Sequence, residues 1–503
     1  MTRWIDRFLD PITMYRLVLY YLVAMLAAAF MLGFFKIVPH DPTAIAFSAV
    51  LITAVCWISN EIFARVFKVP ANSESIYITA LILMLILNPV TAADAKGVGV
   101  LIAASVWAMA SKYIFAVRGQ HLFNPAAVAV ALTALLLDHP ASWWVGGNLP
   151  LLPVVLIGGL LVVRKLRRFD LVAVFMLTAV ATSLATAAPA DYGMVLSEAL
   201  KSSPILFFAF VMLTEPLTAP TRPLPRLVFA ALVGFLFAPN VHIGSFYFTP
   251  ELALLVGNLF AYAAGPRGRF VLTLERIERS AADSYDFIFR SPRRLAFQAG
   301  QYLEWTLGLD HPDNRGNRRY FTVASAPGES SVRLGVKFYR QSSAFKRALA
   351  LMSPGDTIHA AQVAGNFTLP ADPRAKLAFI AGGIGITPFR SMLRELIDRD
   401  EARSITVLYG VGQPDHIAYR DVLDEAQARL GISTVYAVAR GAEPGQYPGR
   451  IDEQLIREAI PDYRERIFYI SGSQAMVQSV RKALIGMGIH RMRIKTDFFP
   501  GLA

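Results

Sequence analysis

Long apolar runs fill the first half of the chain and are missing from the second. A transmembrane helix needs roughly 20 apolar residues to cross about 30 Å of hydrocarbon, although packed or interrupted helices can be shorter. Ten such runs precede residue 265: residues 15–35, 44–58, 76–87, 98–117, 126–137, 149–163, 171–188, 205–213, 227–238 and 252–264. We therefore predict that residues 1–265 form an α-helical membrane bundle of about ten spans.

From residue 270 onward, short strand-like segments replace the long runs. They occupy residues 271–277, 286–290, 297–303, 318–325 and 332–338. Many short strands separated by turns are typical of an antiparallel barrel. We therefore predict a β-barrel domain over residues 268–372.

After residue 376 the pattern changes to buried strands that alternate with helices. The predicted strands are residues 377–381, 404–409, 433–439 and 467–470, and the predicted helices are 389–399, 419–430 and 474–487. This alternation predicts a parallel, doubly wound α/β domain over residues 373–503.

The net charge of +12 is distributed unevenly along the first half. Alternate loops place fifteen Lys and Arg residues on one side of the predicted membrane and three on the other. The larger set is Arg3, Arg7, Arg16, Arg65, Lys68, Lys112, Arg118, Arg164, Lys165, Arg167, Arg168, Arg222, Arg226, Arg267 and Arg269, and the smaller is Lys36, Lys96 and Lys201. Positive short loops face the cytoplasm. We predict a multi-pass protein of the cell inner (plasma) membrane with both termini in the cytoplasm, and no nucleic-acid partner.

Cys56 is the only cysteine in the chain. A disulfide framework and a cluster held by several thiolates of this chain are therefore excluded. Its position inside the second apolar run is typical of a small buried side chain. We expect no metal site.

Two similar segments lie five predicted spans apart in the membrane half. Residues 88–92 read NPVTA and residues 215–219 read EPLTA. An odd number of spans per repeat inverts the second copy, which predicts two inverted five-helix halves with a site near the midplane. An intramembrane carboxylate is costly without a role, so Glu215 is a candidate site residue. Asn88 and Thr218, polar residues of the same two segments, are candidates with it. The alternative is that both segments are ordinary span ends at the membrane interface.

A glycine-rich segment, GGIGITP, joins a predicted strand to a predicted helix at residues 382–388. Gly382, Gly383 and Gly385 let the backbone approach a diphosphate. The helix that begins near Thr387 and Pro388 favours the negative charge. This segment is therefore a candidate dinucleotide loop.

Residues 268–503 resemble the ferredoxin–NADP reductase family. Arg319-Tyr320-Phe321-Thr322 matches the family's Arg-x-aromatic-Ser/Thr flavin motif. The resemblance implies that FAD binds here, with Arg319 on its pyrophosphate, Phe321 on the flavin ring and Thr322 near flavin N5. It also implies that the glycine-rich loop binds NADH or NADPH.

Other elements of this resemblance contain departures. Ser471, which precedes Gly472, replaces the cysteine that many members place beside the nicotinamide. Ser342 and Ser343 fall at the family's second phosphate contact, without its usual glycine. Arg440 follows a predicted strand and would suit a 2′-phosphate, but a single loop Arg is more often solvated, so NADH and NADPH both stay open.

Most of residues 10–265 resemble the D subunit of Rnf electron-transport complexes and the related B subunit of the sodium-pumping NADH:quinone reductase. The similarity includes residues 121–127 (HLFNPAA), which add Asn124 to the candidate membrane site, and residues 213–219. Those subunits hold flavin in the membrane and take part in electron transfer coupled to ion movement. Their covalent FMN motif, Gly/Ser-x-Ala-Thr, is missing from the corresponding loop. We therefore expect no covalent FMN; the alternatives are a noncovalent flavin or a quinone.

These patterns predict a membrane-bound FAD-dependent NAD(P)H oxidoreductase, with Thr322 and Ser471 at the hydride-transfer site. Electrons from FAD would pass into or across the membrane domain to a quinone, a flavin or an outward acceptor. The lipid bilayer and other electron-transfer subunits are the expected partners. The alternative is an ion or solute transporter whose flux the fused reductase domain drives or regulates.

Overall fold

The chain folds into two compact units, Met1–Gly268 and Arg269–Ala503. The computed structural model describes residues 5, 8–9, 12–67, 73–117, 120–220, 222–264, 270–309, 317–339 and 342–497. Six of the basic residues used to predict orientation lie outside these ranges: Arg3, Arg7, Lys68, Arg118, Arg267 and Arg269.

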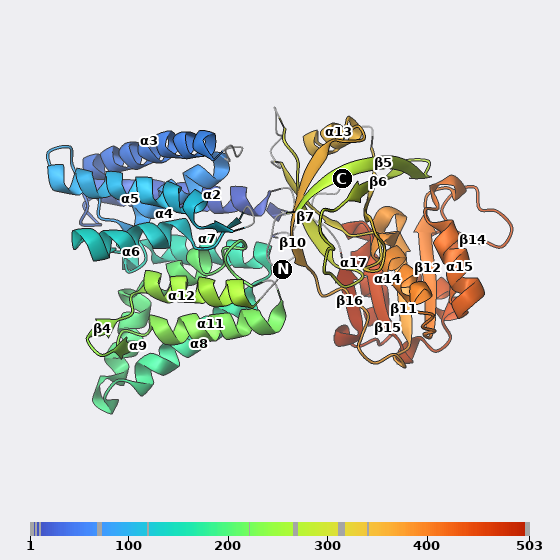
Figure 1. The fold of residues 1–503 in the computed structure, drawn as a ribbon. Coiled ribbons are helices and arrows are strands. Elements are labelled where there is room, and N and C mark those ends of the chain that lie inside the picture. Colours follow the sequence, from blue (N-terminus) through green and yellow to red (C-terminus); the bar gives the residue numbers. More distant parts are fainter. Residues whose placement is uncertain are drawn as a thin grey trace. The chain divides into compact units, whose positions relative to one another are not determined.

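The first unit is helical (Figure 1). Its helices are α2 (Met14–Phe34), α3 (Pro42–Val66), α4 (Ser73–Ile86), α5 (Ala95–Ile114), α6 (Pro125–Leu137), α7 (Leu152–Leu166), α8 (Phe169–Ala185), α9 (Tyr192–Lys201), α10 (Ile205–Phe207), α11 (Pro223–Phe237) and α12 (Pro250–Ala263). A π-helical turn, η3 (Phe208–Met212), continues α10. Each predicted apolar run contains part of one of these elements.

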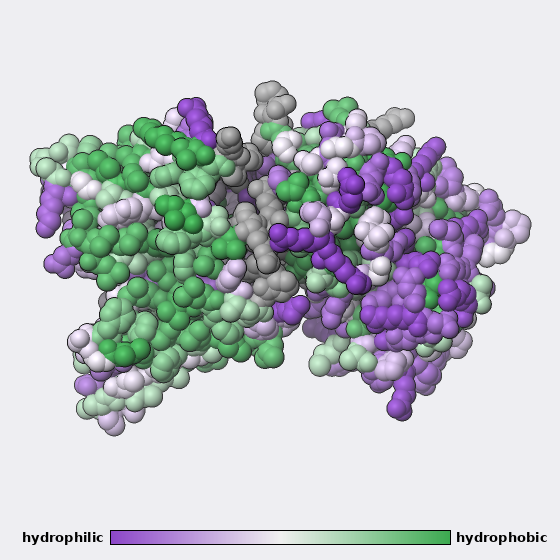
Figure 2. Space-filling view, in the orientation of Figure 1, coloured by the Kyte–Doolittle hydropathy of each residue, from purple (hydrophilic) through white to green (hydrophobic). Residues whose placement is uncertain are grey.

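Several of these helices suit a bilayer. Among the described residues, four helical segments are long and apolar enough to cross a membrane: Met14–Phe34, Pro42–Val66, Ala95–Ile114 and Leu149–Leu166. Five shorter apolar helices accompany them. Large apolar side chains on the outside of the unit, such as Val50, Ile157 and Leu177, are 66–71% exposed. Figure 2 shows a largely hydrophobic surface on this unit and a largely hydrophilic surface on the second unit. The number of membrane crossings stays a prediction.

The same order of elements occurs twice in the helical unit. α5 is followed by the hairpin β1–β2 (Ala116–Val117 and Gln120–His121) and then by α6. α11 is followed by the hairpin β3–β4 (His242–Ile243 and Phe246–Tyr247) and then by α12. Both final helices begin with proline, whose missing N–H costs nothing in the first turn.

The second unit begins with a six-stranded antiparallel sheet in the order β8-β7-β10-β5-β6-β9. Its strands are β5 (Phe270–Ala281), β6 (Ser284–Arg290), β7 (Tyr302–Thr306), β8 (Arg318–Thr322), β9 (Val332–Lys337) and β10 (Thr357–Ala364). Side chains alternate across each strand, so one face buries a core that includes Phe289, Trp305 and Phe321. Closure of the sheet into a barrel stays a prediction.

A six-stranded parallel sheet follows, in the order β14-β13-β12-β11-β15-β16. Its strands are β11 (Leu377–Gly382), β12 (Ile405–Val411), β13 (Ser433–Val438), β14 (Tyr447–Pro448), β15 (Ile467–Ser471) and β16 (Ile494–Asp497). Its helices are α14 (Thr387–Asp398), α15 (Arg420–Leu430), α16 (Glu453–Ala459) and α17 (Gln474–Gly486). Separate apolar cores cover its two faces, which confirms the predicted α/β fold.

The strand order reverses between β11 and β15, the first and fifth strands of the parallel sheet. In an open α/β sheet, ligands bind outside the carboxyl ends of the strands at this point of reversal. The carboxyl ends of β11 and β15 are Gly382 and Ser471, which belong to the two predicted nucleotide elements.

Candidate functional site

The two predicted nucleotide elements meet at this point of reversal. A Cβ atom on Gly385 would lie 2.5 Å from the Ser471 carbonyl oxygen and 2.6 Å from the Gly472 Cα. A Cβ on Gly382 would lie 2.0 Å from the Sδ atom of Met476. Gly383 has a φ of +54°, which disfavours other residue types. The three glycines therefore leave a cradle lined by backbone alone between residues 382–385 and the Ser471–Gly472 segment. A diphosphate site requires such close access to the backbone.

Helix α14 starts directly behind this cradle. Thr387 is its first residue and Pro388 its second, and the Thr387 hydroxyl donates a hydrogen bond of 3.1 Å to the Ile384 carbonyl. The N-terminal end of a helix carries partial positive charge, although here the Thr387 N–H already bonds the Ile384 carbonyl and Pro388 has no N–H. The residues present therefore fit the phosphates of a dinucleotide.

The predicted flavin motif forms β8 of the antiparallel sheet. The Arg319 guanidinium lies over the Phe345 ring, 5.4 Å from its centroid. Phe345 is the second residue of helix α13 (Ala344–Ala350), which Ser343 caps. The Ser342 hydroxyl donates to the Tyr339 carbonyl at 2.7 Å. The fold thus brings Arg319 toward the serine segment that the resemblance associates with phosphate, and this grouping fits a flavin diphosphate.

Alternation along β8 separates its two aromatic rings. Phe321 is 7% exposed and packs in the core, with its ring centroid 6.0 Å from that of Phe345. Tyr320 points to the other face, where its hydroxyl donates to the buried Glu304 carboxylate at 2.6 Å. The stacking of Phe321 on a flavin stays a prediction. Tyr320 is the half-buried aromatic beside it.

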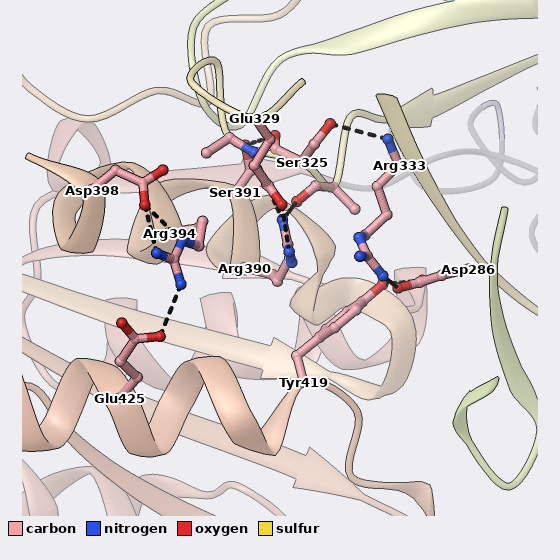
Figure 3. A network of polar contacts seen from close by, with 12 residues as sticks. Asp286, Ser325, Glu329, Arg333, Arg390, Ser391, Arg394, Asp398, Tyr419 and Glu425 are labelled. Atoms are coloured by element: carbon pink, nitrogen blue, oxygen red, sulfur yellow. Dashed lines mark hydrogen bonds and ion pairs between the residues drawn. The ribbon is translucent and has the colours of Figure 1, made fainter. Parts of the chain in front are cut away.

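The chain that leaves β8 is bonded to α14 (Figure 3). The Arg390 guanidinium donates to the Ala324 carbonyl at 2.9 Å and also donates hydrogen bonds to both carboxylate oxygens of Glu329. The Ser391 hydroxyl donates to the Ser325 carbonyl at 2.7 Å. The segment after Thr322 is therefore fixed to the helix that starts at the dinucleotide loop.

A second polar group links the two sheets of this unit. Asp286 on β6 accepts hydrogen bonds from the Tyr419 hydroxyl and the Arg333 guanidinium, both at 2.6 Å (Figure 3). Burial raises the pKa of the Asp286 carboxyl, despite these two donors. A Cβ on Gly335 would lie 2.4 Å from the Tyr419 hydroxyl and 2.7 Å from the Thr387 methyl group. The two sheets are therefore in close contact beside the dinucleotide loop.

The pKa of the Glu329 carboxyl is set by two opposing effects. Burial raises it, but the hydrogen bonds and positive charge of Arg390 outweigh burial and leave the pKa below its usual value of 4.5. Glu329 is therefore an anion at neutral pH and pairs with the Arg390 cation.

In the helical unit, three of the four candidate membrane residues come together. The Glu215 carboxylate accepts hydrogen bonds from Asn124 at 2.8 Å and Thr218 at 3.0 Å, and lies 3.2 Å from His121 Nε2. The Asn258 side chain contacts both the Asn124 amide N–H and the Thr218 carbonyl. His121 and Asn258 are thus parts of the cluster that the sequence did not single out.

The fourth candidate, Asn88, is exposed, and the described contacts do not link it to Glu215. A second acidic residue, Glu251, was not predicted. It is 2% exposed in the first turn of α12 beside Thr249 and Trp143, and its Oε2 atom has no hydrogen-bond partner among the described residues. An acidic residue in a helix's first turn is common, so Glu251 did not stand out in the sequence.

No group of three or more His, Cys, Asp or Glu side chains suited to a metal ion occurs in the part of the chain that the structure describes. Cys56 is buried, as its position in an apolar run predicts.

Comparison with known proteins finds a family match in each half of the chain. Residues 379–482 match the oxidoreductase NAD-binding domain, and residues 146–263 match the NQR2, RnfD, RnfE family. Reductase component 1 of terephthalate 1,2-dioxygenase from Comamonas sp is 29% identical over 213 residues, which are 41% of this chain and 60% of that protein. The flavohemoprotein of Bacillus subtilis (strain 168) is 26% identical over 210 residues, 40% of this chain and 51% of that protein.

Several similar solved structures cover slightly less than half of the chain. The ferredoxin NADP+ reductase of Neisseria gonorrhoeae with bound FAD and NADP is 22% identical, with a TM-score of 0.40 over 46% of this chain and 98% of that one. The chain spans only about half to three fifths of the curated relatives' length. The chain joins a domain of the NQR2, RnfD, RnfE family to an FAD- and NAD-binding oxidoreductase domain of the ferredoxin-reductase type.

Proposed function

We propose that this protein is a membrane-bound FAD-dependent NAD(P)H oxidoreductase. The observation that carries the proposal is the arrangement in the second unit, where α14 links the dinucleotide loop to the segment that follows Thr322. A hydride donor and its acceptor must be held at a fixed short distance, and this arrangement supports such a pairing.

In this proposal each predicted residue has one task. Arg319, Ser342 and Ser343 bind the FAD diphosphate, and Thr322 lies at the hydride-accepting edge of the flavin with Tyr320 and Phe321 on either side of the strand. The backbone of Gly382, Gly383, Gly385 and Gly472, with Thr387 and Pro388, binds the NAD(P)H phosphates, and Ser471 lies beside the nicotinamide. FAD, when bound, accepts a hydride and releases its two electrons one at a time.

We further propose a ten-span membrane domain over residues 1–265, an FAD barrel over 268–372 and an NAD(P) domain over 373–503. The repeated helix–hairpin–helix order supports two inverted halves. The basic loops support an inner-membrane location with cytoplasmic termini. Electrons would leave FAD through the membrane domain toward a quinone, a noncovalent flavin or an outward acceptor.

The buried polar cluster in the helical unit favours a second candidate function, ion transport driven or regulated by the reductase domain. The half-buried Glu215 carboxylate lies among His121, Asn124 and Thr218, and Glu251 is a fully buried acid of the same unit. Intramembrane acids of this kind commonly mark ion or proton pathways. Ion flux into vesicles that stops in Glu215→Gln while NAD(P)H oxidation continues would favour this function.

The test of the first function is direct. The purified full chain is expected to be yellow and to oxidise NADH or NADPH with an artificial electron acceptor. Colourless protein, or flavin that neither nucleotide reduces, would contradict it. Reductase-active vesicles that show no ion flux would count against the second function.

A further inference from the structure

One ion pair in the second unit joins the two halves of the proposed active site without touching either cofactor segment. Arg390 and Glu329 are 61 residues apart in sequence, and the pair spans the contact between the antiparallel and the parallel sheets (Figure 3). Arg390 is 6% exposed, so its charge is removed from water and depends on this partner.

The pair also holds the backbone that follows the flavin motif. The Arg390 guanidinium bonds the Ala324 carbonyl as well as Glu329, and the adjacent Ser391 bonds the Ser325 carbonyl. Only Val323 separates Ala324 from Thr322. On the other side, only Phe389 separates Arg390 from Pro388 of the dinucleotide loop. A shift of this contact therefore moves Thr322 relative to the loop.

We propose that Arg390 and Glu329 are positioning residues that set the distance between the flavin edge and the nicotinamide. The planar guanidinium suits this task because it makes several bonds in a fixed fork, which a lysine cannot reproduce. This inference rests on the proposed oxidoreductase function and adds a role that neither sequence motif contains.

The same helix provides a matched control. Arg394, one turn beyond Arg390, bonds Asp398 at 2.7 Å and Glu425 at 2.8 Å (Figure 3). All three residues belong to the parallel-sheet half, so this ion pair network does not cross between the sheets. Loss of Arg394 removes similar charge and bonding but leaves the contact at Ala324 intact.

The experiment compares the full chain with its Arg390→Ala, Arg390→Lys, Glu329→Gln and Arg394→Ala variants, each checked for FAD content. Rapid-mixing reduction of the flavin gives the limiting rate and the nucleotide dissociation constant separately. The Ala326 N–H donates to the Glu329 carboxylate and the Ala324 N–H to the Arg333 carbonyl, so hydrogen exchange at these two amides gives a readout that needs no turnover. A misplacement of about 1 Å can slow a reaction roughly 100-fold.

We expect Arg390→Ala to slow the limiting reduction rate about 10- to 100-fold. The nucleotide dissociation constant should be unchanged, and both amides should exchange faster. The reduction and exchange rates of Arg390→Lys and Glu329→Gln should lie between those of Arg390→Ala and the parent. The rates of Arg394→Ala should match those of the parent. Parent-like rates and exchange in Arg390→Ala, or equal effects in Arg394→Ala, would overturn the inference. If neither nucleotide reduces the parent protein, the proposed function fails, while the exchange data still decide the positioning role.

Discussion

Gly385→Ala tests the contact between the two nucleotide elements. The new methyl group would lie 2.5 Å from the Ser471 carbonyl oxygen and 2.6 Å from Gly472 Cα. Ordinary contact begins at 3.4 Å, so the Ser471 backbone must move by at least 3.4 − 2.5 = 0.9 Å. No flexible side chain is present to absorb this shift. Overpacking of this kind costs about 1–3 kcal/mol.

Because this overpacking destabilises the backbone conformation that binds NAD(P)H, the affinity for NAD(P)H should drop roughly 5- to 150-fold. FAD content should be unchanged, because Arg319 lies on the antiparallel sheet and the serine segment precedes helix α13, both outside the parallel-sheet half. The assay is titration of the full chain with nucleotide, alongside flavin quantification. Gly486→Ala is the control, since a Cβ there meets no atom within 4 Å. Parent-like affinity in Gly385→Ala, or a parallel loss of FAD, would refute this reasoning.

Three further predictions follow from other parts of the chain. Glu215→Gln removes the charge that organises His121, Asn124 and Thr218, and hydrogen bonds to a charged group contribute roughly 1.5–3 kcal/mol each. The helical unit should therefore melt at a lower temperature, while NAD(P)H oxidation with a soluble acceptor persists. Loss of this activity together with the lower melting temperature would contradict the prediction. The lowered pKa of Glu329 means that its stabilising effect is present above the unfolded pKa near 4.5 and is lost as the pH falls through its folded pKa. Glu329→Gln should flatten the acid limb of the stability profile, and an unaltered profile would show that the ion pair contributes little. All flavin should be released on denaturation, as measured by mass and by fluorescence of the denatured chain, and retained fluorescence would reveal a covalent flavin.

The meeting of the glycine-rich loop with the Ser471 segment could be predicted from the sequence, because it follows from local patterns. Buried strands followed by glycine-rich turns predict a parallel sheet, and such a sheet brings the ends of its strands to one edge. Gly385 and Ser471 meet for that reason, although they are far apart along the chain. Glu215 was also recognisable, since a carboxylate directly after an apolar run of spanning character is rare.

Contacts between distant elements could not be predicted in the same way. Arg390 lies on an amphipathic helix, where a charged residue usually faces water, and nothing local to Glu329 indicates its partner. Asp286 and Tyr419 are 133 residues apart. The face of β8 on which Phe321 lies is decided by the register of a sheet whose core was unknown. Long-range packing determined each of these outcomes.

The most direct test of the central claim uses the purified full chain without oxygen in sealed vesicles. NADH or NADPH is added on the side of the reductase unit, and the visible absorbance of the flavin is followed before and after a quinone is supplied to the membrane. The account predicts that a nucleotide bleaches the flavin and that the quinone restores the colour through the membrane domain. Flavin that neither nucleotide bleaches would contradict the claim that this protein is an NAD(P)H oxidoreductase.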